Sequence, residues 1–232
     1  MSDFNKRIQD KKAELNLLKK KLEELLPLKD KLNIVVYDDD SNYSVVDKFD
    51  GIAFWAKGNA KNIFVTHKDN RFSNYKYVAT DCNNFTLIKK SQHRIVGCLF
   101  DFAANSSLLI ERNFSSGLCE FRLRENFNIY IGYDNMYSSN ITFWTSDGHA
   151  IFDENGKCIN RGGDIFIGDH IWIGHQVKIL KKSKINNNSV VGSNALVNKT
   201  FSASNLLIAG SPAKVIKEGI RWDRRSPLCF PE

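Results

Sequence analysis

A six-residue repeat runs without interruption from Ile167 to Ser202 and constrains the fold of this chain more than any other feature. Each of its six blocks opens with Ile or Val, and the second place holds Gly or Asn in five of the six. A period of six is typical of a β-solenoid, in which each short strand turns a corner and stacks on the equivalent strand of the next coil. The opening aliphatic side chain should point inward, and Gly or Asn should occupy a corner position with positive φ. The repeat predicts a parallel β-solenoid in the C-terminal half.

The composition is that of a soluble globular protein with an excess of positive charge. The chain has 232 residues and a formal net charge of +7. That charge favours acidic partners, namely a phosphate-bearing cofactor, an anionic glycan or the surface of a membrane in peripheral contact. No basic recognition helix or nucleic-acid motif is present, so no nucleic-acid partner is expected.

The sequence also bears on the compartment of the protein. No stretch approaches the ~20 apolar residues that a membrane span requires, and the polar, charged N-terminus does not fit a secretory signal. The five cysteines are scattered and include no CxxC pair, which argues against a disulfide framework or a zinc knuckle. A cytoplasmic location is therefore expected.

The chain divides into four predicted segments. Residues 1–32 carry apolar residues at heptad spacing and should form an amphipathic helix that Pro27 ends near Leu26. Residues 33–105 have poor periodicity and should form irregular β structure, including early solenoid coils. Residues 106–209 form the β-helix domain, and residues 210–232 form a short helix and tail, with Ser211 as N-cap and Pro212 as first helical residue.

The heptad pattern of the first segment leaves two arrangements open. The helix packs on its own subunit, or it forms a bundle with the same helix of other subunits. The sequence does not distinguish between them.

His149 is the first candidate for chemistry, because it lies where residues 144–164 interrupt the repeat and a rigid scaffold tends to carry its function on such loops. An imidazole takes up a proton near neutral pH, and Asp147 or Asp153 is close enough in sequence to orient the ring. On spacing alone, a loop histidine is more often an ordinary solvated residue. His170 and His175 bring the histidines to three, the minimum for a catalytic zinc site, but no acidic or cysteine ligands cluster with them.

Several further side chains are candidates for binding. Trp172 occupies the last place of its block and should point outward, against a subunit, a cofactor or a sugar. Trp144, Tyr133 and Tyr137 are expected to build the same wall as a substrate site. Lys199 and Lys214 bracket the exit from the solenoid and suit a phosphate, although simple solvation is the ordinary role of a surface lysine.

Three motifs together resemble the hexapeptide-repeat acyltransferases, most closely the bacterial O-acetyltransferases that modify capsule or lipopolysaccharide sugars, including sialic acid. These motifs are the blocks from Ile167 onward, Thr145-Ser-Asp-Gly-His149 and Ala209-Gly-Ser-Pro-Ala-Lys214. The resemblance covers about residues 106–222. It implies a left-handed parallel β-helix, a homotrimer, and acetyl-CoA bound between neighbouring subunits.

The resemblance also implies roles for individual residues. His149 matches the catalytic histidine and would act as general base, and Asp147 stays the candidate that orients it. Trp172 matches a tryptophan that lines the active site, and Lys199, Gly210 and Lys214 match positions near the CoA arm. No metal is expected.

The expected function is thus acetyl-CoA-dependent O-acetylation of a sugar hydroxyl on a bacterial surface glycan. Three alternatives stay open at this point. They are a sugar-nucleotide N-acetyltransferase on the same fold, a carbonic-anhydrase-like metal solenoid that uses His149, His170 and His175, and a degenerate scaffold without activity.

Overall fold

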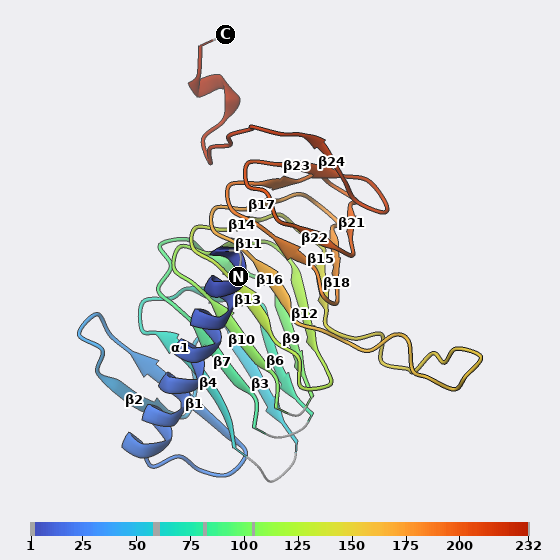
Figure 1. The fold of residues 1–232 in the computed structure, drawn as a ribbon. Helices are drawn as coiled ribbons and strands as arrows, with labels where there is room; N and C mark the ends of the chain where they lie inside the picture. The colour runs from blue at the N-terminus through green and yellow to red at the C-terminus, as the bar shows by residue number, and fades with distance from the viewer. Residues whose placement is uncertain (1–2, 58–60, 81–82, 104, 232) are drawn as a thin grey trace.

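The computed structural model describes residues 3–57, 61–80, 83–103 and 105–231, and within them the chain winds into a three-sided parallel β-helix (Figure 1). One helix, α1 (Asp3–Leu25), precedes the strands. Each coil contributes one strand to each of three sheets, which are called sides A, C and B in the order in which the chain passes through them. The β-helix predicted from the six-residue repeat is confirmed.

The strands of the three sides have the following bounds. Side A contains β1 (Leu32–Tyr37), β2 (Tyr43–Val46), β4 (Asn62–His67), β7 (Phe85–Ile88), β10 (Ser107–Ile110), β13 (Ile129–Ile131), β16 (Ile165–Ile167), β19 (Lys184–Ile185) and β22 (Thr200–Phe201). Side C contains β5 (Phe72–Ser73), β8 (Ile95–Val96), β11 (Ser115–Ser116), β14 (Met136–Tyr137), β17 (Trp172–Ile173), β20 (Val190–Val191), β23 (Leu207–Ala209) and β24 (Lys214–Lys217). Side B contains β3 (Ile52–Ala56), β6 (Tyr75–Ala79), β9 (Cys98–Phe102), β12 (Cys119–Leu123), β15 (Ile141–Trp144), β18 (Lys178–Leu180) and β21 (Leu196–Val197).

The β-helix begins well before residue 106. The strands from β3 to β9 stack in the same three sheets as the later ones, so residues 33–105 supply early coils and the structure has no boundary at 106. Those coils are longer than three blocks of six, because Ile63 pairs with Phe85, 22 residues further on. In the repeat itself Phe166 pairs with Lys184, 18 residues further on.

The opening residue of each block lies in the core, as expected, but the positive φ does not fall on the second place. It falls on the fourth, at His170, Gln176, Lys182, Asn188 and Asn194. The glycines at the second place are required for a different reason, which is the close approach of the next coil. A Cβ on Gly168 would lie 2.4 Å from the side-chain oxygen of Asn187 in the next coil. These glycines thus allow close stacking of coils at the corner, and the expected role in positive φ was wrong.

Helix α1 packs on the outer surface of side A (Figure 1). Its buried residues Ile8, Leu15 and Leu22 cover outward-facing apolar residues of that side, among them Val65 and Leu109. The helix ends at Leu25, two residues before Pro27, and Leu32 already belongs to β1. The buried heptad positions therefore contact the helix's own subunit.

The end of the chain differs from the expected helix at Ser211. Lys214–Lys217 forms β24, which pairs antiparallel with β23 through Ala209 and Lys214. The β-branched pair Val215-Ile216 favours a strand, and the free edge of β23 offers it hydrogen-bonding partners. The only helical turn of the described tail is the 3₁₀ helix η1 (Pro227–Cys229).

Candidate active site

A projecting arm between β15 and β16 carries the candidate base (Figure 1). It is a hairpin held by an isolated bridge between Phe152 and Cys158 and by the Ile159 amide, which donates to the Ile151 carbonyl at 2.9 Å. Ile151, Phe152 and Ile159 are exposed, so the arm presents apolar side chains to its surroundings. Apolar side chains on a projecting segment are typical of a surface that contacts a partner.

His149 lies at the root of this arm and is exposed. Asn160 fixes its backbone, since the Asn160 side-chain amide donates to the His149 carbonyl at 2.8 Å. Within the part of the chain that the structure describes, neither ring nitrogen of His149 has a hydrogen-bond partner. The backbone is therefore held, while both nitrogens of the exposed ring remain accessible to a ligand.

Asp147 does not orient the His149 ring in this structure. Its Oδ2 accepts hydrogen bonds from Lys181 Nζ and, at 2.8 Å, from the Asn160 amide. The hydrogen bond from Lys181 lowers the pKa of Asp147, because the ammonium group favours the ionised carboxylate. Asp153 accepts backbone hydrogen bonds from Asn155 and Lys157 within the arm. The carboxylates thus shape the arm, and Lys181 ties its root to the next coil.

Trp172 lies on side C, and its side chain is 40% exposed, which confirms that it points outward. Beside it lies Trp222, whose ring centroid is 6.2 Å from that of Trp172. Trp222 in turn stacks on His170 at 4.1 Å and donates from its indole nitrogen to the His170 carbonyl at 2.9 Å. The C-terminal tail thereby builds part of the surface around Trp172.

His170 is held on both ring nitrogens. Nδ1 lies 2.7 Å from Asp134 Oδ2, and Nε2 lies 3.2 Å from the Trp222 carbonyl oxygen. Arg224 donates to the other oxygen of Asp134 at 3.0 Å and so fastens the tail to the corner. Sequence reasoning did not find the contribution of Trp222 and Arg224. The one sequence feature that could have indicated it is the segment Arg221-Trp-Asp-Arg-Arg225, in which aromatic and basic residues lie close together.

The three histidines do not form a metal site within one chain. His149 follows side B, His170 lies at the corner between sides A and C, and His175 lies at the corner between sides C and B. They occupy three different corners of the coil, so one subunit does not bring the three side chains together.

One other group could hold a metal ion among the residues that the structure describes. It consists of Asp39, His67 and Asp69. Lys90 Nζ already lies 2.7 Å from Asp39 and 3.3 Å from Asp69. Its ammonium group supplies the positive charge that a metal would bring.

The expected aromatic wall does not form as a unit. Tyr133 is exposed at the corner between sides A and C, near the tail. Trp144 lies on side B under the guanidinium of Arg122, at 5.2 Å. Tyr137 is a core residue with 3% exposure, pairs in register with Ile173, and stacks on Phe143. Burial raises the pKa of Tyr137 well above its ordinary value. Its assignment to a substrate site was wrong.

A groove of about 520 Å³ runs along the corner between sides C and B. Its lining includes Lys178, Leu196 and Ser211. Gly210 borders it, because its carbonyl accepts from the Leu196 amide at 3.0 Å. The structure therefore places Gly210 beside a groove that suits an extended ligand. Lys199 lies between β21 and β22, at another corner, and Lys214 is exposed on β24.

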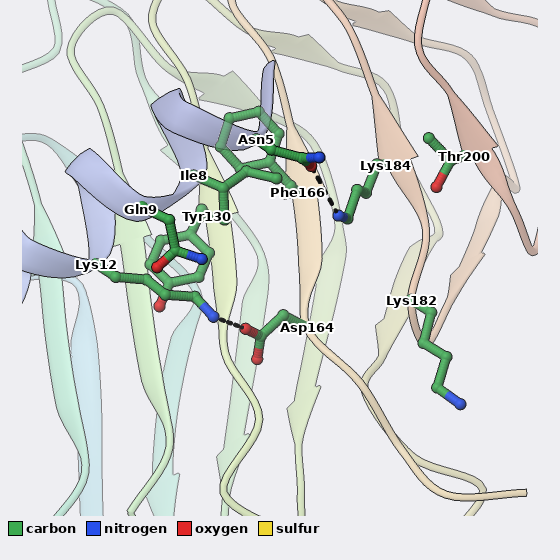
Figure 2. A pocket seen from close by; sticks show the side chains of 10 residues that line it. All are labelled: Asn5, Ile8, Gln9, Lys12, Tyr130, Asp164, Phe166, Lys182, Lys184 and Thr200. Atoms are coloured by element: carbon green, nitrogen blue, oxygen red, sulfur yellow. Dashed lines mark hydrogen bonds and ion pairs between the residues drawn. The ribbon is translucent and has the colours of Figure 1, made fainter. Parts of the chain in front are cut away.

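A second cavity, of about 580 Å³, lies between the first turns of α1 and side A (Figure 2). Figure 2 shows Lys12 pointing at Asp164, the last residue before β16, with 2.5 Å between the charged atoms. On the other edge, Lys184 reaches Asn5 at 3.5 Å. The first contact joins α1 to the residue at which the arm returns to β16, and the second joins it to β19.

A parallel β-helix built on a six-residue repeat, with an exposed imidazole at the root of its arm, is the architecture predicted above for a hexapeptide-repeat acyltransferase. The chain is 36% identical to the polysialic acid O-acetyltransferase of Neisseria meningitidis over 144 residues, which are 62% of this chain and 67% of that protein. No family model matches the chain. This relationship shows that the chain belongs to the hexapeptide-repeat acyltransferases and, within them, to the family of the meningococcal O-acetyltransferase.

Solved structures agree with this assignment. The polysialic acid O-acetyltransferase OatWY superimposes with a TM-score of 0.68 at 29% identity, over 84% of this chain and 88% of that one. The polySia-specific acetyltransferase NeuO has the same fold, with a TM-score of 0.55 at 23% identity over 84% and 90% of the two chains. The left-handed β-helix is thus confirmed, and the protein is an O-acetyltransferase.

Proposed function

We propose that this enzyme transfers the acetyl group of acetyl-CoA to a hydroxyl of a sialic acid residue in a bacterial surface glycan, in capsule or lipopolysaccharide, or in its precursor. The names of the related enzymes support a sialic acid acceptor. The net charge of +7 suits an anionic acceptor and the phosphates of CoA. The observation that carries the proposal is the exposed His149 imidazole, unpartnered among the described residues, at the root of the arm.

His149 acts as the general base. Its ring nitrogen removes the proton from the sugar hydroxyl while that oxygen attacks the thioester carbonyl and forms the new ester bond. The carbon–sulfur bond then breaks, and His149 returns the proton to the departing sulfur. Because transfer is direct, no nucleophilic side chain is required. A backbone N–H or the Trp172 indole N–H stabilises the negative charge that develops on the carbonyl oxygen.

The active site is proposed to lie between two subunits of a homotrimer. The arm with His149 leaves the corner between sides B and A, whereas Trp172 lies on side C, the side opposite that corner in a triangular coil. One subunit therefore does not bring these two side chains together. A closed ring of identical subunits does so, because each head-to-tail interface joins two different surfaces. The exposed Ile151, Phe152 and Ile159 of the arm supply apolar contact area for this interface.

CoA is proposed to lie along the groove at the corner between sides C and B. Lys178 offers a positive charge there, and Gly210 and Ser211 let the backbone approach the ligand. Lys214, exposed on the neighbouring strand, is a further partner for a phosphate. Lys199 belongs to this site only if a neighbouring subunit brings its corner to the groove.

A cytoplasmic location is proposed with this function, because acetyl-CoA is made and used there. The described cysteines, Cys98, Cys119, Cys158 and Cys229, are all free thiols, as in a reducing compartment. Within the described ranges no helix has the length and hydropathy for a membrane span.

The test is consumption of acetyl-CoA, followed as release of free thiol, across sialic acid, oligosialic acid, neutral sugars and amino-sugar nucleotides. Thiol release with a sialic acid acceptor, lost in His149→Ala, is the expected result. An ester product that alkaline hydroxylamine removes distinguishes O-acetylation from amide formation. Turnover with amino sugars alone, or retained turnover in His149→Ala, would overturn the proposal.

A further inference from the structure

A basic groove lies at the N-terminal end of the β-helix, several coils away from the arm and Trp172. It has a volume of about 840 Å³ and lies where side C begins with its edge strand β5. Four cationic side chains line it with a single carboxylate, Asp50. The four, which are called the cationic rim below, are Lys48, Lys68, Arg71 and Arg94.

The charges of this rim are largely uncompensated. Lys48, Lys68 and Arg94 make no ion pair or side-chain hydrogen bond within the described ranges, and Arg71 donates only to the neutral Gln92 carbonyl at 3.0 Å. The lysines beside α1 behave differently, since Lys89 Nζ lies 2.5 Å from Glu14 and 3.0 Å from Glu111. Adjacent exposed cations repel one another, so this rim is stabilised by an anionic ligand.

Apolar side chains share the lining with these cations and with the polar Asn70. Val46, Phe49 and Phe72 contribute to it, and the rings of Phe49 and Phe72 meet edge to face at 5.6 Å. A ligand that fits must therefore carry negative charges on its edges and C–H groups on its faces. Acidic sugars have this chemistry, because each ring combines a carboxylate with an apolar face.

The groove and Trp172 lie along the same side of the β-helix. Arg71 directly precedes β5 and Arg94 directly precedes β8, and on side C the strand order is β5, β8, β11, β14, β17. Strands in a sheet are about 4.8 Å apart, so Trp172 on β17 is roughly 20 Å from β5. A single sugar does not span this distance, but an oligosaccharide does.

We propose that the cationic rim is an accessory binding site for a linear polyanionic glycan, whose chain runs along side C from this groove toward Trp172. The inference rests on the proposed function for the acetylated sugar, and it adds a second site that holds the acceptor chain away from the reacting hydroxyl. Multiple weak contacts along one chain raise the local concentration of its sugars at the active site.

The experiment measures binding of sialic acid oligomers of defined length to His149→Ala protein by calorimetry, so that it needs no turnover. Lys68→Glu/Arg94→Glu is introduced into this background, and neither side chain has a described ion pair or hydrogen bond that the change would break. Lys6→Glu/Lys76→Glu, at exposed positions of α1 and β6, is the control with the same change in net charge. Single-stranded DNA of equal charge serves as a second polyanion.

We expect long oligomers to bind His149→Ala protein, and the rim variant to weaken this binding by about tenfold or more, since two attractive charges become repulsive. The control should retain it, and oligomers too short to reach from Trp172 should bind all three proteins alike. Equal binding of long oligomers to the rim variant and the control, or no binding to the parent, would overturn the inference. If single-stranded DNA bound as tightly as sialic acid oligomers of equal charge, the rim would be a site for any polyanion, and this result would also overturn the inference.

The outcome is separable from that of the proposed function. In active protein, the rim variant should keep its kcat on short acceptors and lose affinity only for long ones. Loss of transfer to every acceptor in the parent enzyme would contradict the proposed function, while the binding experiment would still decide the role of the rim.

Discussion

The coils up to β15, called the wide coils below, and those from β16 onward, called the narrow coils, fill the interior of the β-helix with different side chains. On side B, one inward-facing column runs from Tyr77 through Phe100, Phe121 and Phe143 and then continues as Ile179 and Val197. From Tyr77 to Phe143 the column is aromatic and its members lie 21–23 residues apart, whereas Ile179 and Val197 are aliphatic and lie 18 residues apart. A wider coil encloses more volume, and close packing requires larger side chains to fill it.

This difference separates two functions along one scaffold. The arm with His149 leaves where the wide coils end and the narrow coils begin, and the outward Trp172 lies on the first narrow coil. The wide coils give space for the groove with the cationic rim. The narrow coils therefore carry Trp172 of the proposed active site, and the wide coils carry the cationic rim proposed to bind the acceptor chain.

His149→Ala should have the largest effect on activity. Loss of a positioned general base costs about 10²–10⁴ in rate. The exposed position predicts that the variant folds like the parent, which circular dichroism and sedimentation check. A rate within threefold of the parent would remove His149 from the mechanism.

Core substitutions should separate the two types of coil. Phe121→Ala, in the stacked aromatic column, should lower the free energy of unfolding by about 3–5 kcal/mol, because the rigid wide coil cannot close the cavity. Ile179→Val, in the narrow coils, should cost about 0.5–1.5 kcal/mol. Urea unfolding at one fixed protein concentration measures both. Equal losses would mean that the aromatic column does not stabilise the wide coils as described.

The sequence predicted the fold well where the coils are narrow and regular, and less well where they are wide and irregular. The six-residue repeat predicted the narrow coils. The same repeat places Tyr137 in the core, because Tyr137 pairs in register with Ile173, which opens a block. The wide coils lack a fixed period because their corners vary in length, so the sequence predicted early coils there without the bounds of their strands. The stacking of Trp222 on His170 joins residues far apart in the chain, which periodicity does not address.

Trp222→Ala should weaken acceptor binding moderately. An aromatic pair contributes about 0.5–1.5 kcal/mol, and its loss should raise KM by about two- to tenfold with a smaller change in kcat. Trp222→Phe should restore most of the affinity. The matched control is Trp55→Ala, an exposed tryptophan on side B of the wide coils. A change in KM as large in Trp55→Ala would show that the effect is not specific to the tail.

Lys181→Ala should have the smallest effect. Lys181 lowers the pKa of Asp147, so the pair contributes stability above the unfolded pKa of about 3.9 and loses it as pH falls through the lowered folded pKa. Because Asp147 is exposed, the contribution should stay below about 1 kcal/mol. Urea unfolding of parent and variant should differ at neutral pH and converge in acid. A difference that persists in acid would assign Lys181 a role other than this ion pair.

The most direct test of the account is subunit complementation. His149→Ala and Trp172→Ala proteins, each inactive or nearly so, are co-expressed at equal amounts with different affinity tags, and mixed oligomers are purified. If each site takes His149 from one subunit and Trp172 from its neighbour, one of the three sites in every mixed trimer is intact, so purified mixed trimers should show about a third of the parent's activity. Mixed oligomers as inactive as the two variants alone would contradict a site shared between subunits.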